Sequence, residues 1–292
     1  MNSDPTIDPL IALALLEDLG DRGDITSQTF IDSDHISIGK IVSREDAVVS
    51  GIRIMDRVFE KVDPDLKTTA VHPDGDEVAK GDVIYTVEGK TRSILTGERT
   101  ALNFLQRLSG VATVTREFHR LVSHTKVKLL DTRKTTPGWR IIEKEAVVHG
   151  GGDNHRMGLY DAAMIKDNHL VANPDPASIE KQIAGLKEKF PGTMVIVEAD
   201  HLSQVDDFLR VKGVNRILLD NMSPEQLWTA VRKRDEVNPD VQLEASGGVN
   251  LDTVKTIAET GVDFISIGAL THSICAIDFG MDLETISQSR PV

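Results

Sequence analysis

The stretch MVIVEADHLSQVDDFLRVKGVNRILLDN (194–221) carries two short apolar runs, MVIVEAD and RILLDN, separated by a helical segment, LSQVDDFLRVKG. Each run is almost continuously apolar, which predicts a strand that is buried on both faces. Two such strands joined by a helix are typical of parallel neighbours, because parallel strands need a long crossover connection. The stretch therefore predicts one β/α/β unit of a parallel sheet.

The same pattern fills the C-terminal part of the chain. Six apolar runs predict strands: VKLLDT (127–132), AAMIKD (162–167), MVIVEAD (194–200), RILLDN (216–221), VQLEASGG (241–248) and FISIGAL (264–270). Helical segments join most of them, for example PASIEKQIAGLKEKF (176–190), SPEQLWTAVRKRDEV (223–237) and LDTVKTIAETG (251–261). The alternation favours a barrel of β/α units, with a doubly wound parallel sheet as the alternative.

The N-terminal part has a different character. Residues 9–19 predict an amphipathic helix that ends at Gly20, and residues 36–91 are β-rich with frequent turn signals. Within them, HPDGDEVAKGDVIYTVEG (72–89) resembles the hammerhead of biotinyl and lipoyl carrier domains but lacks their Met-Lys tip. Residues 94–122 predict a long helix with a kink at Ser109-Gly110. We therefore expect a separate α/β domain without a carrier function.

Composition excludes several classes of protein. The 292 residues carry a net charge of −13, with 33 Lys+Arg against 46 Asp+Glu, so general nucleic-acid binding is not expected. One cysteine, Cys275, excludes an internal disulfide and a cysteine-based zinc site. No apolar stretch reaches the roughly 18 residues of a membrane helix. The run Leu10–Leu16 is too short and too acidic afterwards for a signal peptide, so we expect a cytoplasmic location without membrane association.

Chemically useful residues recur where the predicted strands end. These ends are Asp131-Thr132-Arg133-Lys134, Lys166-Asp167, Glu198, Asp220, Ser246-Gly247-Gly248 and Gly268. A β/α barrel builds its active site from the carboxyl ends of its strands, so these residues are expected to share one mouth. The last two ends are glycine-rich and precede helices, which is typical of a phosphate site.

Basic residues gather at this mouth in an otherwise acidic chain. Arg133, Lys134, Arg156 and Lys166 would converge there with His155, and HGGGDNHR (149–156) supplies three glycines for a close approach. Guanidinium and ammonium groups bind carboxylates and phosphates, so the cluster predicts a pocket for small anions. A solvated basic face is the alternative, which the position at strand ends disfavours.

The sequence allows more than one function for the carboxylates of Glu198 and Asp220 and for Lys166. Glu198 and Asp220 are expected to bind Mg²⁺ or sugar hydroxyls, unless they serve as ion-pair partners for nearby cations. Lys166 in IKDNH (165–169) admits a Schiff base, as in an aldolase. Ser246 is expected to contact phosphate rather than to act as a nucleophile, because the sequence places no histidine base beside it.

Several motifs, in order, resemble those of the quinolinate phosphoribosyltransferase family. They are ALLEDLGDRGDITS, GERTALNFLQRLSGVAT, LLDTRKTTPGWR, EKEAVVHGGGDNHR, DAAMIKDNH, ILLDN, EASGGV and SIGALTHS. The resemblance implies an N-terminal α/β hammerhead-like domain (1–112, joined by 276–292). It also implies an open, incomplete TIM-like β/α barrel (113–275) as the catalytic domain.

The resemblance also implies a reaction and a set of site residues. Quinolinate and phosphoribosyl pyrophosphate would give nicotinate mononucleotide, pyrophosphate and CO₂, a step of de novo NAD biosynthesis. The catalytic residues would be Lys134, Lys166, Glu198 and Asp220. Substrate would be bound by Arg99, Arg133, His155, Arg156, Ser246, Gly247 and Gly268. Mg²⁺ would contact Glu198 and Asp220 or be held mainly by substrate, and no organic cofactor would be needed.

The expected assembly is a homodimer in which Arg99 reaches the site of the partner subunit, and a hexamer of dimers is compatible with the resemblance. Two positions depart from the family's pattern: Trp139 stands where Leu is frequent, and Glu145 stands where Tyr is frequent. An inward-pointing Glu145 would change substrate preference.

Three other functions compete with this one. They are a lyase or aldolase barrel using Lys166, a non-catalytic phosphate- or carrier-type binding protein, and a paralogous group associated with molybdate transport. The intact TGERTALN and GGGDNHR motifs disfavour the last of these.

Overall fold

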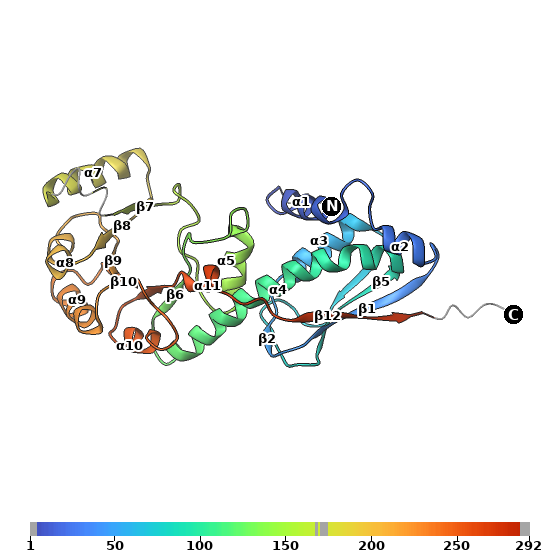
Figure 1. Cartoon of the computed structure of the whole chain (residues 1–292). Helices are drawn as coiled ribbons and strands as arrows, with labels where there is room; N and C mark the ends of the chain where they lie inside the picture. Colours follow the sequence, from blue (N-terminus) through green and yellow to red (C-terminus); the bar gives the residue numbers. More distant parts are fainter. Residues whose placement is uncertain (1–4, 167–168, 170–174, 287–292) are drawn as a thin grey trace. The chain divides into compact units, whose positions relative to one another are not determined.

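The computed structural model describes residues 5–166, 169 and 175–286 (Figure 1). Within them the chain divides into two compact units. The first comprises residues up to Val114, Pro137–Gly151 and the segment from Ile274 onward; the second comprises Thr115–Thr136 and Gly152–Ser273. The predicted boundaries at 112 and 276 stay predictions, and the sequence did not indicate that 137–151 belongs with the first unit.

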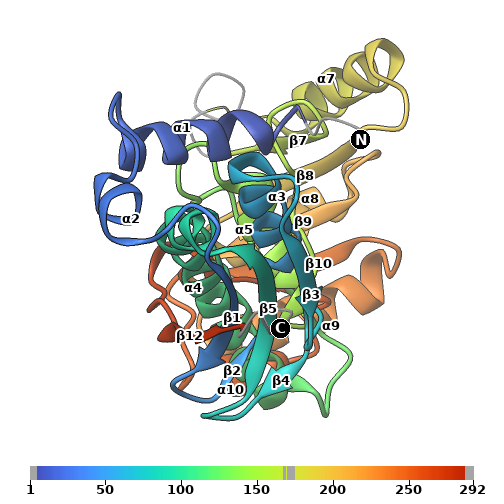
Figure 2. The same ribbon diagram turned by 90° about the vertical axis from the view of Figure 1, so that its right-hand side faces the viewer.

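The first unit is built on a four-stranded antiparallel sheet of order β12-β1-β5-β3 (Figure 2). Its strands are β1 (Ile36–Ser43), β3 (Lys67–Ala70), β5 (Val83–Lys90) and β12 (Phe279–Thr285). β2 (Ala47–Val48) pairs separately with β4 (Glu77–Val78). Because β12 pairs with β1, the C-terminal segment returns to the N-terminal domain, as the resemblance implied.

Helices accompany this sheet. They are α1 (Asp8–Leu19), α2 (Ile25–Phe30), α3 (Ile52–Val62), α5 (Arg140–His149) and the long α4 (Thr91–Val122), which runs into the second unit. Residues 36–91 had been predicted as β-rich, and helix α3 within them was not predicted. Its signal was present, because Ile52, Met55 and Phe59 are buried at helical spacing. The Asp74 carboxylate accepts hydrogen bonds from the backbone N–H of Gly51 and Ile52 and caps the helix.

Helix α4 is continuous through Ser109 and Gly110, and the kink predicted there stays a prediction. The packing of the chain gives a separate reason for the glycine. A Cβ at Gly110 would lie 2.1 Å from the carbonyl oxygen of Cys275, so only glycine lets the returning chain pass this close. Gly110 therefore fixes the path of the segment that leads into β12.

The second unit is a six-stranded parallel sheet of order β6-β11-β10-β9-β8-β7 (Figure 1). Its strands are β6 (Lys128–Leu130), β7 (Ala162–Ile165), β8 (Met194–Ala199), β9 (Arg216–Asp220), β10 (Gln242–Ser246) and β11 (Phe264–Ser266). The helices are α7 (Pro176–Lys189), α8 (Leu202–Phe208), α9 (Pro224–Val237), α10 (Val254–Ala258) and α11 (Ala269–His272).

Each of the six predicted strands is present, and β6 and β7 do not pair with each other among the described residues. Asp167, the predicted end of the second strand, lies outside those residues. The α/β prediction of a hammerhead-like domain followed by an open, incomplete TIM-like barrel is confirmed. In the part of the chain that the structure describes, no helix is long and apolar enough to span a bilayer.

Side chains of the parallel strands alternate between two faces. On one face, Ile217, Leu243 and Val197 are fully buried. The other face carries Leu218 beside Glu244 and, one step further along, Asp220 beside Ser246. This second face leads to the carboxyl ends of the strands, so every second residue of each strand is a candidate site residue.

Two glycine-to-alanine changes in helices test the role of Gly110. Gly185→Ala, in α7 with nothing within 4 Å of the new Cβ, should raise the free energy of unfolding by about 0.5–1 kcal/mol. Gly110→Ala gains the same helix propensity but forces the Cys275 backbone to move, so it should lower stability by about 1 kcal/mol or more. Urea unfolding of both variants measures this. Equal stabilisation by both changes would contradict the close approach.

Candidate active site

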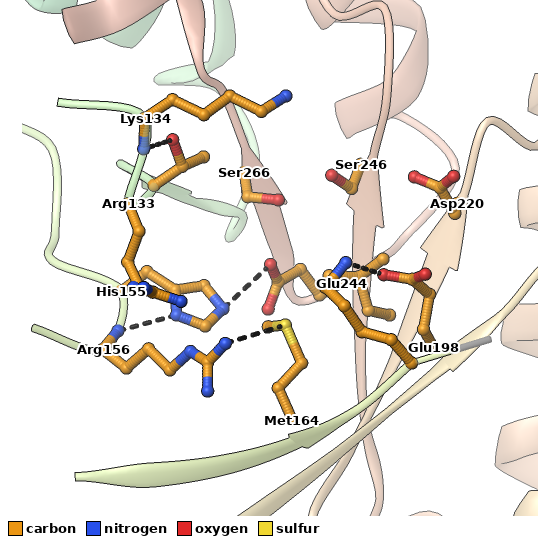
Figure 3. Close-up of a pocket in the computed structure, with 13 residues that line it drawn as sticks. Arg133, Lys134, His155, Arg156, Met164, Glu198, Asp220, Glu244, Ser246 and Ser266 are labelled. Atoms are coloured by element: carbon orange, nitrogen blue, oxygen red, sulfur yellow. Dashed lines mark hydrogen bonds and ion pairs between the residues drawn. The ribbon is translucent and has the colours of Figure 1, made fainter. Parts of the chain in front are cut away.

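A pocket of about 360 Å³ lies at the carboxyl ends of the parallel strands of the second unit (Figure 3). It is lined by Thr132, Arg133, Lys134, His155, Arg156, Met164, Lys166, Glu198, Leu218, Asp220, Glu244, Ser246 and Ser266. Nine of these had been predicted from strand ends and basic motifs: Thr132, Arg133, Lys134, His155, Arg156, Lys166, Glu198, Asp220 and Ser246. The chain therefore brings most of the predicted site residues together.

Alternation along the strands explains which side chains reach the pocket. Asp220 and Ser246 are register partners at the ends of β9 and β10, and Ser266 on β11 continues the same row. Two positions earlier, Glu198, Leu218 and Glu244 are register partners in the row below. Leu218 and Glu244 were not predicted, because only the strand ends were considered as site residues. A step of two back along β9 and β10 would have found them.

Two cations at one end of the pocket have no acidic partner among the described residues. The Arg133 guanidinium and the Lys134 ammonium follow β6, and both residues are exposed. The segment is held by its backbone: the Thr271 hydroxyl donates to the Lys134 carbonyl oxygen at 2.8 Å. A fixed backbone with unneutralised side chains is suited to binding an anion.

Arg156 adds a third, partly buried cation to the same end (Figure 3). Its guanidinium donates to the Ala162 carbonyl oxygen at 3.0 Å and lies 3.6 Å from the Met164 sulfur. Burial lowers the pKa of this guanidinium, and the nearby positive charge of Arg133 lowers it further, against an opposing effect of Asp161. The two guanidinium groups repel each other, and an anionic ligand would relieve that repulsion.

The opposite end of the pocket is acidic. The Lys166 ammonium pairs with the Glu198 carboxylate, while the Asn221 amide donates to Asp220 Oδ2 at 2.6 Å. Asn221 has a φ of 54°, and its backbone N–H donates to the Ser246 carbonyl oxygen at 2.8 Å. A Cβ at Gly247 would lie 2.2 Å from Asn221 Oδ1, which explains the glycine there. Asp220 and Ser246 are thus held side by side.

Beneath the cations lies a buried group that the sequence analysis missed. Glu244 is fully buried, with its two carboxylate oxygens 3.3 Å from His155 Nε2 and 2.9 Å from an Arg216 nitrogen. Burial alone raises the pKa of the Glu244 carboxyl, but His155 and Arg216 outweigh it and the net pKa is lowered. Glu244 is therefore an ionised carboxylate on the floor of the pocket.

Three predicted residues do not line the pocket. Gly247 and Gly268 follow β10 and β11, whose last residues, Ser246 and Ser266, line the pocket. A Cβ at Gly268 would lie 3.1 Å from the Lys134 side chain. Arg99 is an exposed residue of α4 in the first unit.

The two positions that depart from the family's pattern have partners within the first unit. Trp139 stacks on Phe104 with ring centroids 4.7 Å apart, and both Glu145 oxygens lie 2.8 Å from Arg53. The ion pair gives Glu145 a structural role.

The residues present offer a magnesium ion few ligands. No group of three or more histidine, cysteine, aspartate or glutamate side chains with metal-binding geometry occurs among the described residues. Glu198 and Asp220 are two carboxylates at the acidic end, and Mg²⁺ commonly takes one or two carboxylates together with substrate phosphates and water. The donor set therefore fits an ion brought in largely by a phosphorylated substrate.

Comparisons with known proteins show similarity to one family over almost the whole chain. The family models for the N- and C-terminal domains of quinolinate phosphoribosyl transferase match residues 24–109 and 111–282. A rice protein named nicotinate-nucleotide pyrophosphorylase [carboxylating], chloroplastic, is 42% identical over 96% of this chain and 79% of its own length. A Synechocystis relative, a probable nicotinate-nucleotide pyrophosphorylase [carboxylating], is 40% identical over 95% of this chain and 92% of its own.

Solved structures are similar over the whole chain. The nicotinate-nucleotide pyrophosphorylase of Francisella tularensis aligns with a TM-score of 0.87 and 38% identity, covering 97% of this chain and 98% of its own. NadC of Streptococcus pyogenes aligns with a TM-score of 0.90 and 35% identity, covering 98% and 100%.

The unpaired cations predict that a small dicarboxylate, benzene-1,2-dicarboxylate, binds the pocket. Replacing both Arg133 and Lys134 with alanine should weaken binding of this dicarboxylate at least about tenfold, because each charge-assisted hydrogen bond contributes roughly 1.5–3 kcal/mol. Arg232→Ala, on α9 outside the pocket lining, is the control and should bind normally. Calorimetric titration measures the affinities. Unchanged binding by the double variant would show that these cations do not form the anion site.

Proposed function

The chain belongs to the quinolinate phosphoribosyltransferase family, and on that premise we propose roles for the residues around its pocket. The enzyme joins quinolinate to phosphoribosyl pyrophosphate and releases pyrophosphate and CO₂, leaving nicotinate mononucleotide. One observation carries the assignment of the pocket. A chain of net charge −13 leaves Arg133 and Lys134 without acidic partners, among the described residues, beside a desolvated Arg156.

Quinolinate is a pyridine with two adjacent carboxylates, and the basic end of the pocket suits it. Arg133 and Arg156 would each bind a carboxylate, with Lys134 adding positive charge and His155 lining the same end. Guanidinium groups bind a carboxylate through two parallel hydrogen bonds, so two of them fix the plane of the ring. The proposal thus assigns the adjacent carboxylates to the two arginines.

Phosphoribosyl pyrophosphate would occupy the acidic end. Glu198 and Asp220 are placed for the ribose hydroxyls, Lys166 for the pyrophosphate, and Ser246, Gly247 and Gly268 for the 5′-phosphate. Mg²⁺, with Glu198 and Asp220 as its nearest protein carboxylates, would neutralise part of the pyrophosphate charge when bound. No organic cofactor is required.

The residues can then stabilise each change of charge. The C1′–oxygen bond breaks with its electron pair leaving on pyrophosphate, and Glu198 and Asp220 face the positive charge that develops on the ribose. The pyridine nitrogen donates its lone pair to C1′ and becomes cationic. The adjacent ring carbon then loses CO₂, and the electron pair left there, stabilised by the cationic nitrogen, takes up a proton. Fixed charges are the main catalytic device in this scheme.

The ion pair of Lys166 helps to distinguish the transferase from the competing function, a lyase that would form a Schiff base on this lysine. The Lys166 ammonium is engaged by the Glu198 carboxylate, whereas a Schiff-base lysine must present a free amine to the substrate carbonyl. The transferase needs that positive charge for pyrophosphate. The ion pair therefore favours the transferase over a Schiff-base mechanism.

We also propose a cytoplasmic homodimer. Arg99 is an exposed cation outside the unit that holds the pocket, which fits a contribution to the site of the partner subunit. A hexamer of dimers would be a higher assembly of the same kind.

The reaction is tested by mixing the protein with Mg²⁺, phosphoribosyl pyrophosphate and either quinolinate or nicotinate. We expect CO₂ and pyrophosphate in equal amounts from quinolinate only, with loss of turnover when a chelator removes Mg²⁺. Borohydride should trap no substrate adduct on Lys166. Turnover of nicotinate but not quinolinate would sink the proposed function.

The shared site is tested by complementation. Arg133→Ala and Arg99→Ala should each lower kcat/KM on the order of 10²-fold, because each removes a charge fixed at the substrate. An equal mixture of the two variants should recover about a quarter of wild-type activity, since half of the dimers would carry one intact site. Subunit exchange is verified by mass spectrometry. Exchange without recovery of activity would rule out a site completed by Arg99 of the partner subunit.

A further inference from the structure

Arg216, Glu244 and His155 form a buried column of contacting side chains at the basic end of the pocket, and Figure 3 shows two of them, Glu244 and His155. The Arg216 guanidinium lies 3.7 Å from the centroid of the Phe264 ring. Glu244 accepts a hydrogen bond from Arg216 at 2.9 Å, and its other carboxylate oxygen faces His155. The exposed fractions of Arg216, Glu244 and His155 are 6%, 0% and 8%. The column therefore connects the interior of the barrel to the substrate pocket.

Glu244 is out of place as a core residue. Its register partner on the neighbouring strand β9 is the apolar Leu218, whereas Glu244 is a fully buried carboxylate. Burying a carboxylate is costly unless partners compensate it, and replacing a buried ion pair by apolar side chains is often neutral or stabilising. The parallel sheet does not need the Glu244 carboxylate for its stability. We therefore look for the role of this carboxylate in the neighbouring pocket.

The hydrogen bonds of His155 determine where its proton lies. The backbone N–H of Arg156 donates to His155 Nδ1 at 2.6 Å, so Nδ1 carries no proton. The ring then carries its proton on Nε2, the nitrogen that lies 3.3 Å from Glu244. In a doubly protonated ring, the Nδ1–H of His155 would point at the backbone N–H of Arg156, and two donors would face each other. The same bond ties the ring to the backbone of Arg156, whose guanidinium lines the pocket.

We propose that Glu244 is a positioning residue: paired with Arg216, it keeps His155 as the Nε2–H tautomer, and His155 in turn holds Arg156 in place for the substrate carboxylate. The identity of that substrate rests on the proposed function, whereas the geometry of the column is independent of it.

Glutamine at position 244 makes a sharp test, because it keeps the size of glutamate but not its two acceptors. In Glu244→Gln, the amide oxygen should turn to the charged Arg216 and leave the amide N–H₂ facing His155. The ring must then accept at Nε2 and carry its proton on Nδ1, which opposes the Arg156 N–H. The KM for quinolinate should rise about tenfold or more, with a smaller change in the KM for phosphoribosyl pyrophosphate.

A double variant separates positioning from stability. In Arg216→Met with Glu244→Gln, the buried guanidinium is gone, so the glutamine oxygen is free to accept from His155 Nε2–H. This variant should recover the wild-type tautomer and most of the affinity for quinolinate. Asp263→Asn is the matched control, because Asp263 pairs with Arg234 at 2.7 Å and is bonded to the backbone N–H of Leu243, near the start of β10. It should lower stability without changing the KM for quinolinate.

The tautomer is read directly from nitrogen NMR of protein labelled with ¹⁵N-histidine. Nine histidines contribute, and His155→Gln assigns the relevant signals. We expect the Nε2–H form in the wild type and the double variant, and the Nδ1–H form in Glu244→Gln. A wild-type ring that is protonated or carries its proton on Nδ1 would overturn the proposal, as would an unchanged quinolinate KM in a folded Glu244→Gln. If the wild type turned over no quinolinate, the proposed function would fail while the tautomers still decided the role of Glu244.

Discussion

The site depends on positive charges that the described part of the protein does not neutralise. Carboxylates are available in the same pocket, yet Glu198 pairs with Lys166 and Glu244 with His155 and Arg216. Arg133 and Lys134 have no acidic partner among the described residues, and Arg156 is partly buried beside them. Such an arrangement costs free energy in the empty protein, and an anionic substrate offsets that cost on binding. We propose that the two guanidinium groups at one end of the pocket select a dicarboxylate.

The parallel sheet gives these charges their positions. Strands that alternate faces send every second side chain toward the pocket, so the same β9 and β10 carry Leu219 and Ala245 in the apolar core and Asp220 and Ser246 at the site. Close backbone contacts then fix the positions of the strand ends, as between Gly247 and Asn221. Packing of the apolar core therefore also fixes the positions of the site residues, because both sets of side chains belong to the same strands.

Much of this could be predicted from the sequence. Continuous apolar runs located the six parallel strands, and the residues just after them supplied most of the pocket lining. Glu244 and Arg216 escaped prediction because they lie inside strands, where a charge is visible but its partners are not: Glu244 meets His155 from a distant segment. Helix α3 escaped prediction because it is a single short helix within the otherwise β-rich stretch 36–91, where the turn residues were assigned to connections between strands. The grouping of 137–151 with the first unit, through contacts such as Trp139 on Phe104, depends on tertiary packing that periodicity does not report.

The central claim is that paired guanidinium groups select two adjacent carboxylates, independently of catalysis. Calorimetric binding of benzene-1,2-dicarboxylate, which lacks the reactive nitrogen, and of nicotinate, which lacks one carboxylate, tests it most directly. The account predicts that the dicarboxylate binds close to the affinity of quinolinate and that nicotinate binds at least about tenfold more weakly, the free-energy equivalent of one charge-assisted hydrogen bond. Equal binding of nicotinate and quinolinate would contradict it.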